Sequence, residues 1–149
     1  MKNIKRTLLS AILLLLLVSN NYPQHALFQP LGDLPGGAFK SCANGVSPDG
    51  SVIVGYGTTD LGEQAFLWTE TSGMISLGNL PDSGFIKSWA NSVSEGGKVI
   101  AGYGDSDGSG WDSYQGFIWT DSGGMKPVGN LDGSVRSMAF SVSANGSVI

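Results

Sequence analysis

The sequence predicts an all-β protein: tandem four-stranded antiparallel blades in an incomplete, propeller-like array of two complete blades and a partial third. The motif Leu/Val-Gly-Asp/Asn-Leu begins at Leu31 and returns at Leu77 and Val128. Its copies lie 77 − 31 = 46 and 128 − 77 = 51 residues apart, a spacing typical of propeller blades and kelch-type units. The 23 glycines and the charged fraction of 13% indicate short strands joined by tight turns. We therefore expect repeats at residues 31–76 and 77–127 and a partial repeat at 128–149.

Each complete repeat contains four short segments that we expect to form strands. In repeat 1 they cover residues 41–46, 52–56, 64–69 and 75–78. In repeat 2 they cover 88–93, 99–103, 115–120 and 127–129, and repeat 3 offers 137–142. The first turn is Ser47-Pro48-Asp49-Gly50, in which proline presets φ, aspartate bonds its own backbone and glycine accepts a positive φ. Pro127 cannot donate to a ladder, so its segment is expected to be an edge strand or irregular.

The apolar patterns indicate which strands are buried. Residues 52–56 form a continuous apolar run, which indicates a strand covered on both faces. Gly55 leaves room there for another backbone or an aromatic ring. Phe66 and Trp68 share one face of the third strand and are expected to lie in the core. The counterparts of these residues in repeat 2 are Gly102, Phe117 and Trp119.

Cys42 is the only cysteine, so the chain cannot form an internal disulfide. Its counterparts in the other repeats are Trp89 and Met138, two large apolar residues. A free cysteine commonly behaves as a small buried hydrophobe. We therefore expect Cys42 to lie in the core, with a reactive thiol as the alternative.

The first 26 residues have the pattern of a signal peptide. Lys2, Lys5 and Arg6 form a basic start, and a mainly apolar run follows over residues 8–18. A membrane-spanning helix needs roughly 20 apolar residues, so this run is short for a spanning anchor and suits an export leader. We expect a secreted, cell-surface or periplasmic protein, with an uncleaved N-terminal anchor as the alternative.

The ordered set of motifs resembles the HAF family of bacterial extracellular repeats. The motifs that carry the resemblance stand at residues 31–37, 46–56, 64–69 and 73–74, and they recur over nearly all of 31–149. Where that family has His-Ala-Phe, this chain has Gln64-Ala65-Phe66 and Gln115-Gly116-Phe117, so no role tied to that histidine carries over. The resemblance implies secretion or surface display and a propeller-like β fold, without assigning an activity.

The charge of the chain restricts its partners. Without the leader, five basic and twelve acidic residues remain, a net charge of 5 − 12 = −7. An acidic surface repels phosphate backbones, which argues against nucleic acid as a partner. It argues equally against anionic membranes, so no membrane contact beyond the leader is expected.

Few residues could support catalysis. His25 is the only histidine and lies beside the expected cleavage point, outside the repeats, so a Ser-His-Asp or Cys-His arrangement is not expected in the folded region. The acidic residues fall mostly in turns, as at Asp49 and Asp121, where solvated carboxylates are ordinary. We therefore expect a protein that is not an enzyme and has no organic cofactor.

A loop in repeat 2 has part of a calcium-binding pattern. Asp105, Asp107 and Ser109 occupy positions 1, 3 and 5 of such a loop, and Gly110 occupies position 6. Asp112 could add another oxygen, but position 12 is a glycine where a bidentate Glu is needed. This pattern suggests a weak Ca²⁺ site, with an ordinary acidic loop as the alternative.

Two further sets of residues could bind a ligand. Lys40, Lys87 and Arg136 precede the first strand of each repeat, and stacked blades would bring them into an arc suited to an anionic sugar or a partner's carboxylates. The alternative is that these cations flank core strands and pair with the nearby acids Asp33, Asp82 or Asp132. Exposed Trp111 and Tyr114 would favour sugar stacking, whereas their burial would favour a scaffold.

These observations favour an exported repeat protein with a structural or interaction role. The alternatives are a carbohydrate-binding module or part of a larger extracellular enzyme. The sequence ends at residues 147–149, where the other copies continue with Gly-Tyr-Gly, so we expect a truncated propeller fragment. Self-association through the exposed edge of the terminal blade is the alternative, and a protein or a carbohydrate is the expected kind of partner.

Overall fold

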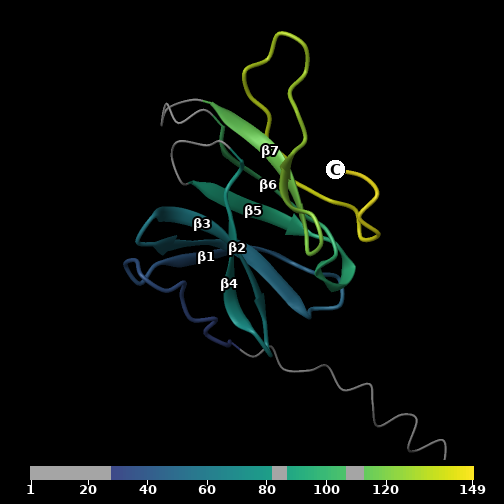
Figure 1. The fold of residues 1–149 in the computed structure, drawn as a ribbon. Coiled ribbons are helices and arrows are strands. Elements are labelled where there is room, and N and C mark those ends of the chain that lie inside the picture. The colour runs from purple at the N-terminus through teal and green to yellow at the C-terminus, as the bar shows by residue number, and fades with distance from the viewer. Residues whose placement is uncertain (1–27, 82–86, 107–112) are drawn as a thin grey trace, which may run out of the picture. The chain divides into compact units, whose positions relative to one another are not determined.

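The computed structural model describes residues 28–81, 87–106 and 113–149. The chain divides into two compact units, Met1–Pro30 and Leu31–Ile149. Of the first unit, only residues 28–30 are described, and they have no regular secondary structure. The second unit is all-β and contains two four-stranded antiparallel sheets (Figure 1).

Sheet 1 contains the first four strands in sequential order, β1-β2-β3-β4. Their bounds are Ser41–Val46 for β1, Val52–Thr59 for β2, Gly62–Thr69 for β3 and Gly73–Gly78 for β4. The last strand crosses the expected boundary between repeats 1 and 2 at residues 76 and 77.

Sheet 2 repeats this order as β5-β6-β7-β8. Its strands are β5 (Ser88–Val93), β6 (Ile100–Asp105), β7 (Tyr114–Thr120) and β8 (Gly124–Pro127), and a short 3-10 helix, η1 (Glu95–Gly97), joins β5 to β6. β8 ends at Pro127 on the edge of the sheet, as a residue without an N–H permits. Residues 128 and 129, expected to belong to this strand, are not part of it.

The two sheets share their register as well as their order. A bulge interrupts the first pairing after Ala43 in sheet 1 and after Ala90 in sheet 2. In the second pairing, Gly55 lies opposite Phe66 and Gly102 opposite Phe117. A Cβ at Gly102 would lie 2.1 Å from the Trp89 carbonyl oxygen and 2.6 Å from Phe117 Cζ, which confirms that this glycine makes room for a backbone and a ring.

A serine organises the turn after the first strand of each repeat. Ser47 Oγ accepts the backbone N–H of Val52 at 2.9 Å, and the same bond is made to Ser94 and to Ser143 at the equivalent places. In repeat 1, Gly50 has a φ of 74°, a conformation that glycine adopts at little steric cost. The positive φ expected of the turn glycine recurs at Gly97 and Gly146, which also have a φ of 74°, whereas the serine bond was not expected from the sequence.

The main core lies between the two sheets. β5 contacts β1, β2 and β3, so the first strand of sheet 2 covers the face of sheet 1 (Figure 1). The buried side chains of this interface come from both sheets: Val52, Val54, Ala65, Leu77, Leu80, Ala90, Val93, Ile100, Phe117 and Met125. Since burial of apolar area is the main favourable term in folding, this interface joins the two sheets into one unit.

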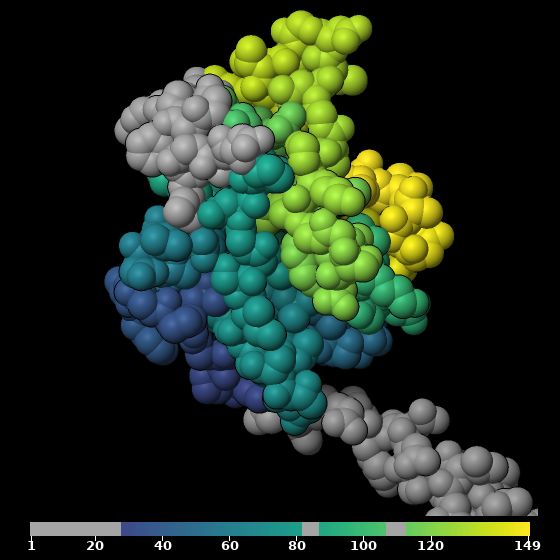
Figure 2. Space-filling view, viewed as in Figure 1, coloured from purple at the N-terminus to yellow at the C-terminus, as the bar shows by residue number. Residues whose placement is uncertain are grey.

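Repeat 3 covers sheet 2 without forming a strand. Ala139 and Val142 are buried against Ala101, and Figure 2 shows the C-terminal residues, in yellow, against the green surface of sheet 2. Residues 137–142, expected to be a strand, have no regular structure. The backbone of this segment lacks the second strand that β2 supplies to β1, and a ladder needs that partner.

Two expectations about burial are wrong. Cys42 is exposed rather than part of the core, and its counterparts Trp89 and Met138 are not fully buried either. Phe66 and Phe117 are fully buried, but Trp68 is only half-buried near the end of its strand. Trp119 is half-buried as well, and it packs against the main core.

Candidate functional site

The strongest candidate site is a face of sheet 1, and its geometry follows from the junction between the two sheets. At that junction Ser88 Oγ accepts the backbone N–H of Ala65 at 2.9 Å and donates to the Gly78 carbonyl at 2.7 Å. Asn44 Nδ2 donates to the Ala90 carbonyl at 2.9 Å. These bonds satisfy backbone groups that the stacking of the sheets removes from water.

The contact between sheet 2 and repeat 3 uses the same bonds at equivalent residues. Ser137 Oγ accepts the Gly116 N–H at 3.0 Å and donates to the Gly129 carbonyl at 2.8 Å. Asn91 Nδ2 donates to the Ala139 carbonyl at 2.9 Å. Two successive contacts with one bonding pattern show that each repeat presents one standard face to the repeat before it.

In repeat 1 none of the described residues covers that standard face. The valine just before the turn serine of each repeat is 5% exposed at Val93 and 8% exposed at Val142, but 60% exposed at Val46. Ser41 and Ala43 are also exposed, whereas their counterparts in sheet 2, Ser88 and Ala90, are fully buried. We call the surface of Ser41, Ala43 and Val46 the β1 face.

The three cations expected to form an arc differ in exposure and in the contacts that the structure gives them. Lys40 is exposed and its Nζ donates to Glu63 Oε1 at 2.9 Å, and this hydrogen bond, with the charge of Glu63, holds the pKa of Lys40 above its usual value. Lys87 is half-buried and Arg136 is exposed. The side chain of Lys40 therefore pairs with Glu63 in sheet 1, whereas its backbone N–H donates to Asp33 at 2.8 Å.

Most of the calcium pattern falls outside the described residues. This holds for Asp107, Ser109 and Asp112. Asp105 ends β6 and is 2% exposed, and its N–H donates to the Lys87 carbonyl. Among the residues that the structure describes, no three His, Cys, Asp or Glu side chains gather as metal ligands would.

Of the two aromatic residues considered for sugar stacking, the structure describes one. Trp111 lies outside the described residues, whereas Tyr114 is half-buried at the start of β7. Its ring packs edge-on against Trp89 and Tyr103, with centroid distances of 5.8 and 5.6 Å. Burial in this cluster raises the pKa of the Tyr103 phenol. The Tyr114 ring is therefore part of a packed cluster and is not a free platform for a sugar.

The sequence reasoning missed the β1 face. The triplet Ser41, Ala43 and Val46 was readable as a strand with counterparts at 88–93 and 137–142, but exposure depends on which neighbour covers the strand. No family model matches this chain, and no curated protein or solved structure is similar to it. None of the described residues belongs to a helix of the length and apolarity needed to cross a membrane.

Proposed function

We propose that this protein is an exported repeat scaffold with a structural or interaction role at the cell surface or in the periplasm, whose two sheets are blades of a propeller-like stack. The observation that carries the proposal is the β1 face, where Val46 is 60% exposed although its two counterparts are buried. A surface that repeats a buried interface residue by residue is suited to bind another unit of the same kind.

The occupant that fits the β1 face is a second copy of this chain. Sheet 1 presents an apolar surface to β5. A blade that docks on the β1 face must present the equivalent surface. Repeat 3 of a second copy could present that surface, because its Met138 and Phe140 are exposed by 38% and 67%. Apolar side chains are thus exposed both on the β1 face and on repeat 3, and burying them together removes both from water.

The repeat also predicts the register of this contact. Phe140 is the counterpart of Asn44 in repeat 1 and of Asn91 in repeat 2. Each of these two asparagines donates a hydrogen bond to an alanine carbonyl of the repeat that follows, Ala90 or Ala139. Phe140 of one copy would therefore lie beside Ala43 of the next copy. Because the two contacting surfaces differ, the contact is head-to-tail, and such contacts build rings or filaments.

The leader and the chemistry of the repeats support the rest of the proposal. The basic start and apolar run of residues 2–18 favour export, and the resemblance to HAF repeats favours a propeller-like stack outside the cytoplasm. Residues 31–149 contain no histidine, which favours a binding role over general acid-base catalysis.

Sedimentation velocity of the purified protein over a range of concentrations tests the proposal. We expect a mass that rises with concentration and an association that Val46→Asp removes, because the substitution places a charge in the contact. Leu61→Asp is the matched control, since Leu61 is equally exposed but lies in the β2–β3 turn. A protein that stays monomeric at all concentrations, or equal association of both variants, would contradict the proposal.

A further inference from the structure

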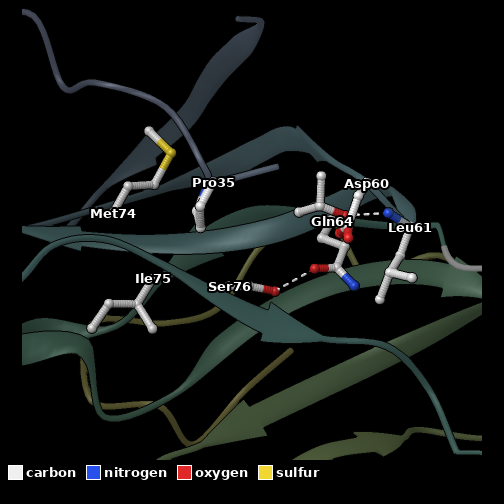
Figure 3. Close-up of a pocket in the computed structure, with 8 residues that line it drawn as sticks. Pro35, Asp60, Leu61, Gln64, Met74, Ile75 and Ser76 are labelled. Carbon is white, nitrogen blue, oxygen red and sulfur yellow. Dashed lines mark hydrogen bonds between the residues drawn. The ribbon is translucent and has the colours of Figure 1, made fainter. Parts of the chain in front are cut away.

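We propose that a pocket at the edge of sheet 1 binds one residue of a neutral carbohydrate, held by the side-chain amide of Gln64. The pocket has a volume of about 380 Å³, within the roughly 300–1,000 Å³ of small-molecule sites. It lies between the segment at Pro35, the β2–β3 turn and β4 (Figure 3). This inference is independent of the association proposed above.

Two hydrogen bonds hold the oxygen end of the Gln64 amide. The backbone N–H of Gly78 donates to Ser76 Oγ at 3.1 Å, and Ser76 Oγ donates to Gln64 Oε1 at 2.7 Å. The hydrogen bond from Ser76 Oγ places the Gln64 oxygen beside Ser76, and the amide nitrogen therefore lies on the other side.

The nitrogen of this amide is a donor without a protein partner. Gln64 is 7% exposed, and its Nε2 makes no hydrogen bond to another residue in the described part of the chain. Figure 3 shows the nitrogen turned away from Ser76, on the side where Leu61 lies. The nitrogen is not among the fully buried polar atoms that lack a partner, so it is accessible to solvent, and an acceptor of a ligand in the pocket can take the place of water there.

This arrangement belongs to sheet 1 alone. Ser76 lies opposite Phe66 in the β3–β4 pairing, and the residue opposite Phe117 in sheet 2 is Pro127. Proline has no hydroxyl, so Gln115 cannot be held in the same way. The two repeats share their backbone plan but differ at this position, which indicates a site built on one repeat of the scaffold.

The chemistry of the pocket favours a neutral sugar. The Asp60 carboxylate lines the same pocket and accepts hydrogen bonds only, so it complements a ligand hydroxyl while Gln64 donates to a neighbouring oxygen. Pro35, Leu61 and Met74 supply apolar surface for the C–H face of a sugar ring. The negative charge of Asp60 disfavours a phosphate or a carboxylate in the pocket.

Chemical-shift titration of the ¹⁵N-labelled protein tests the inference. The probes are glucose, galactose, mannose and N-acetylglucosamine, with glucuronate and inorganic phosphate as anionic comparisons. We expect at least one neutral sugar to shift the Gln64 side-chain amide signals at concentrations up to ~10 mM. Gln64→Leu and Ser76→Ala should each weaken that binding by about tenfold or more, because each removes or releases the donor.

Gln115→Leu is the matched control and should leave the sugar binding unchanged. Val46→Asp should also leave it unchanged, which distinguishes sugar binding at this pocket from association through the β1 face. The inference is overturned if none of the neutral sugars shifts the Gln64 signals. It is also overturned if glucuronate or phosphate binds as well as the neutral sugars, or if Gln64→Leu, folded by its ¹⁵N spectrum, binds them like the parent. Should that variant fail to fold, Ser76→Ala decides in the same way.

Discussion

The hydroxyl of Ser88 accepts the backbone N–H of Ala65 at 2.9 Å, and so joins the first strand of sheet 2 to the third strand of sheet 1. The same hydroxyl donates to the Gly78 carbonyl at 2.7 Å. Ser137 makes the equivalent pair of bonds to Gly116 and Gly129. One serine in repeat 2 and one in repeat 3 thus satisfy a donor of the repeat before and an acceptor of their own repeat.

Removing the Ser88 hydroxyl should destabilise the fold. In Ser88→Ala the N–H of Ala65 loses its partner inside a buried interface, and leaving a buried group unpaired costs about 1–3 kcal/mol. The free energy of unfolding, measured by urea denaturation followed by tryptophan fluorescence, should fall by that amount.

Ser41→Ala is the control for this prediction. Ser41 is the counterpart of Ser88 but is exposed, and its hydroxyl donates only to the Gly32 carbonyl at 3.1 Å. Water can replace that bond, so the expected change is within about 0.5 kcal/mol. Equal losses in the two variants would show that the junction does not depend on Ser88.

The paired valines give a second test. Val93 is buried between the sheets and Val46 is exposed, so Val93→Ala should lower the free energy of unfolding by roughly 1–3 kcal/mol while Val46→Ala changes it little. Both variants should be measured at the lowest practical concentration, where the proposed association does not contribute. A larger loss for Val46→Ala would contradict the burial that the structure gives these residues.

Gly102 should not tolerate a side chain. A Cβ at this position would lie 2.1 Å from the Trp89 carbonyl oxygen, so Gly102→Ala forces the backbones of β5 and β6 apart. Overpacking of this kind typically costs about 1–3 kcal/mol. Gly104→Ala is the milder comparison, because its nearest neighbour would be 3.0 Å away; thermal unfolding of the two variants should rank Gly102→Ala as the less stable.

Asp49 should titrate well below its usual range. Its carboxylate accepts hydrogen bonds from the Ser47 and Ser51 hydroxyls at 2.5 and 2.8 Å, and these bonds lower its pKa from 3.8 to about 2. A two-dimensional NMR titration of the side-chain carboxyl carbon measures this value directly. A midpoint near 3.8 would mean that the hydrogen bonds are absent in solution.

The same shift fixes the sign of the pH dependence. The pKa is lower in the folded state, so the contribution of Asp49 to stability is complete above about 3.8 and is lost as the pH falls toward about 2. Asp49→Asn should remove this dependence and keep the turn, because Asn145 already accepts the Ser143 and Ser147 hydroxyls in repeat 3. Loss of the folded state at neutral pH in Asp49→Asn would contradict this comparison.

The sequence predicted local structure better than burial. The first strand of each complete repeat was placed correctly, because the turn that follows it has chemistry that is readable in four residues. Cys42 was placed in the core because its counterparts are large and apolar, but those counterparts, Trp89 and Met138, are themselves not fully buried. Burial is a property of the neighbour as well as of the strand, so the repeat pattern alone does not predict it.

The pocket at Gln64 shows a second limit. Gln64 stands where the HAF pattern has a histidine, but the sequence does not indicate what the glutamine side chain contacts. The hydrogen bond from Ser76 depends on the pairing of β3 with β4 and on the bulge between Ala65 and Phe66. A register shift of one residue is not visible in a single sequence, so this contact required the structure.

Cross-linking between copies tests the central claim, head-to-tail stacking of blades on the β1 face, most directly. One protein would carry Cys42→Ala with Ala43→Cys, and the other Cys42→Ala with Phe140→Cys, so that each has a single thiol. After mild oxidation of an equimolar mixture, we expect the disulfide between position 43 of one copy and position 140 of the other to predominate. No disulfide, or homodimers of each variant in statistical proportion to the mixed dimer, would contradict the account.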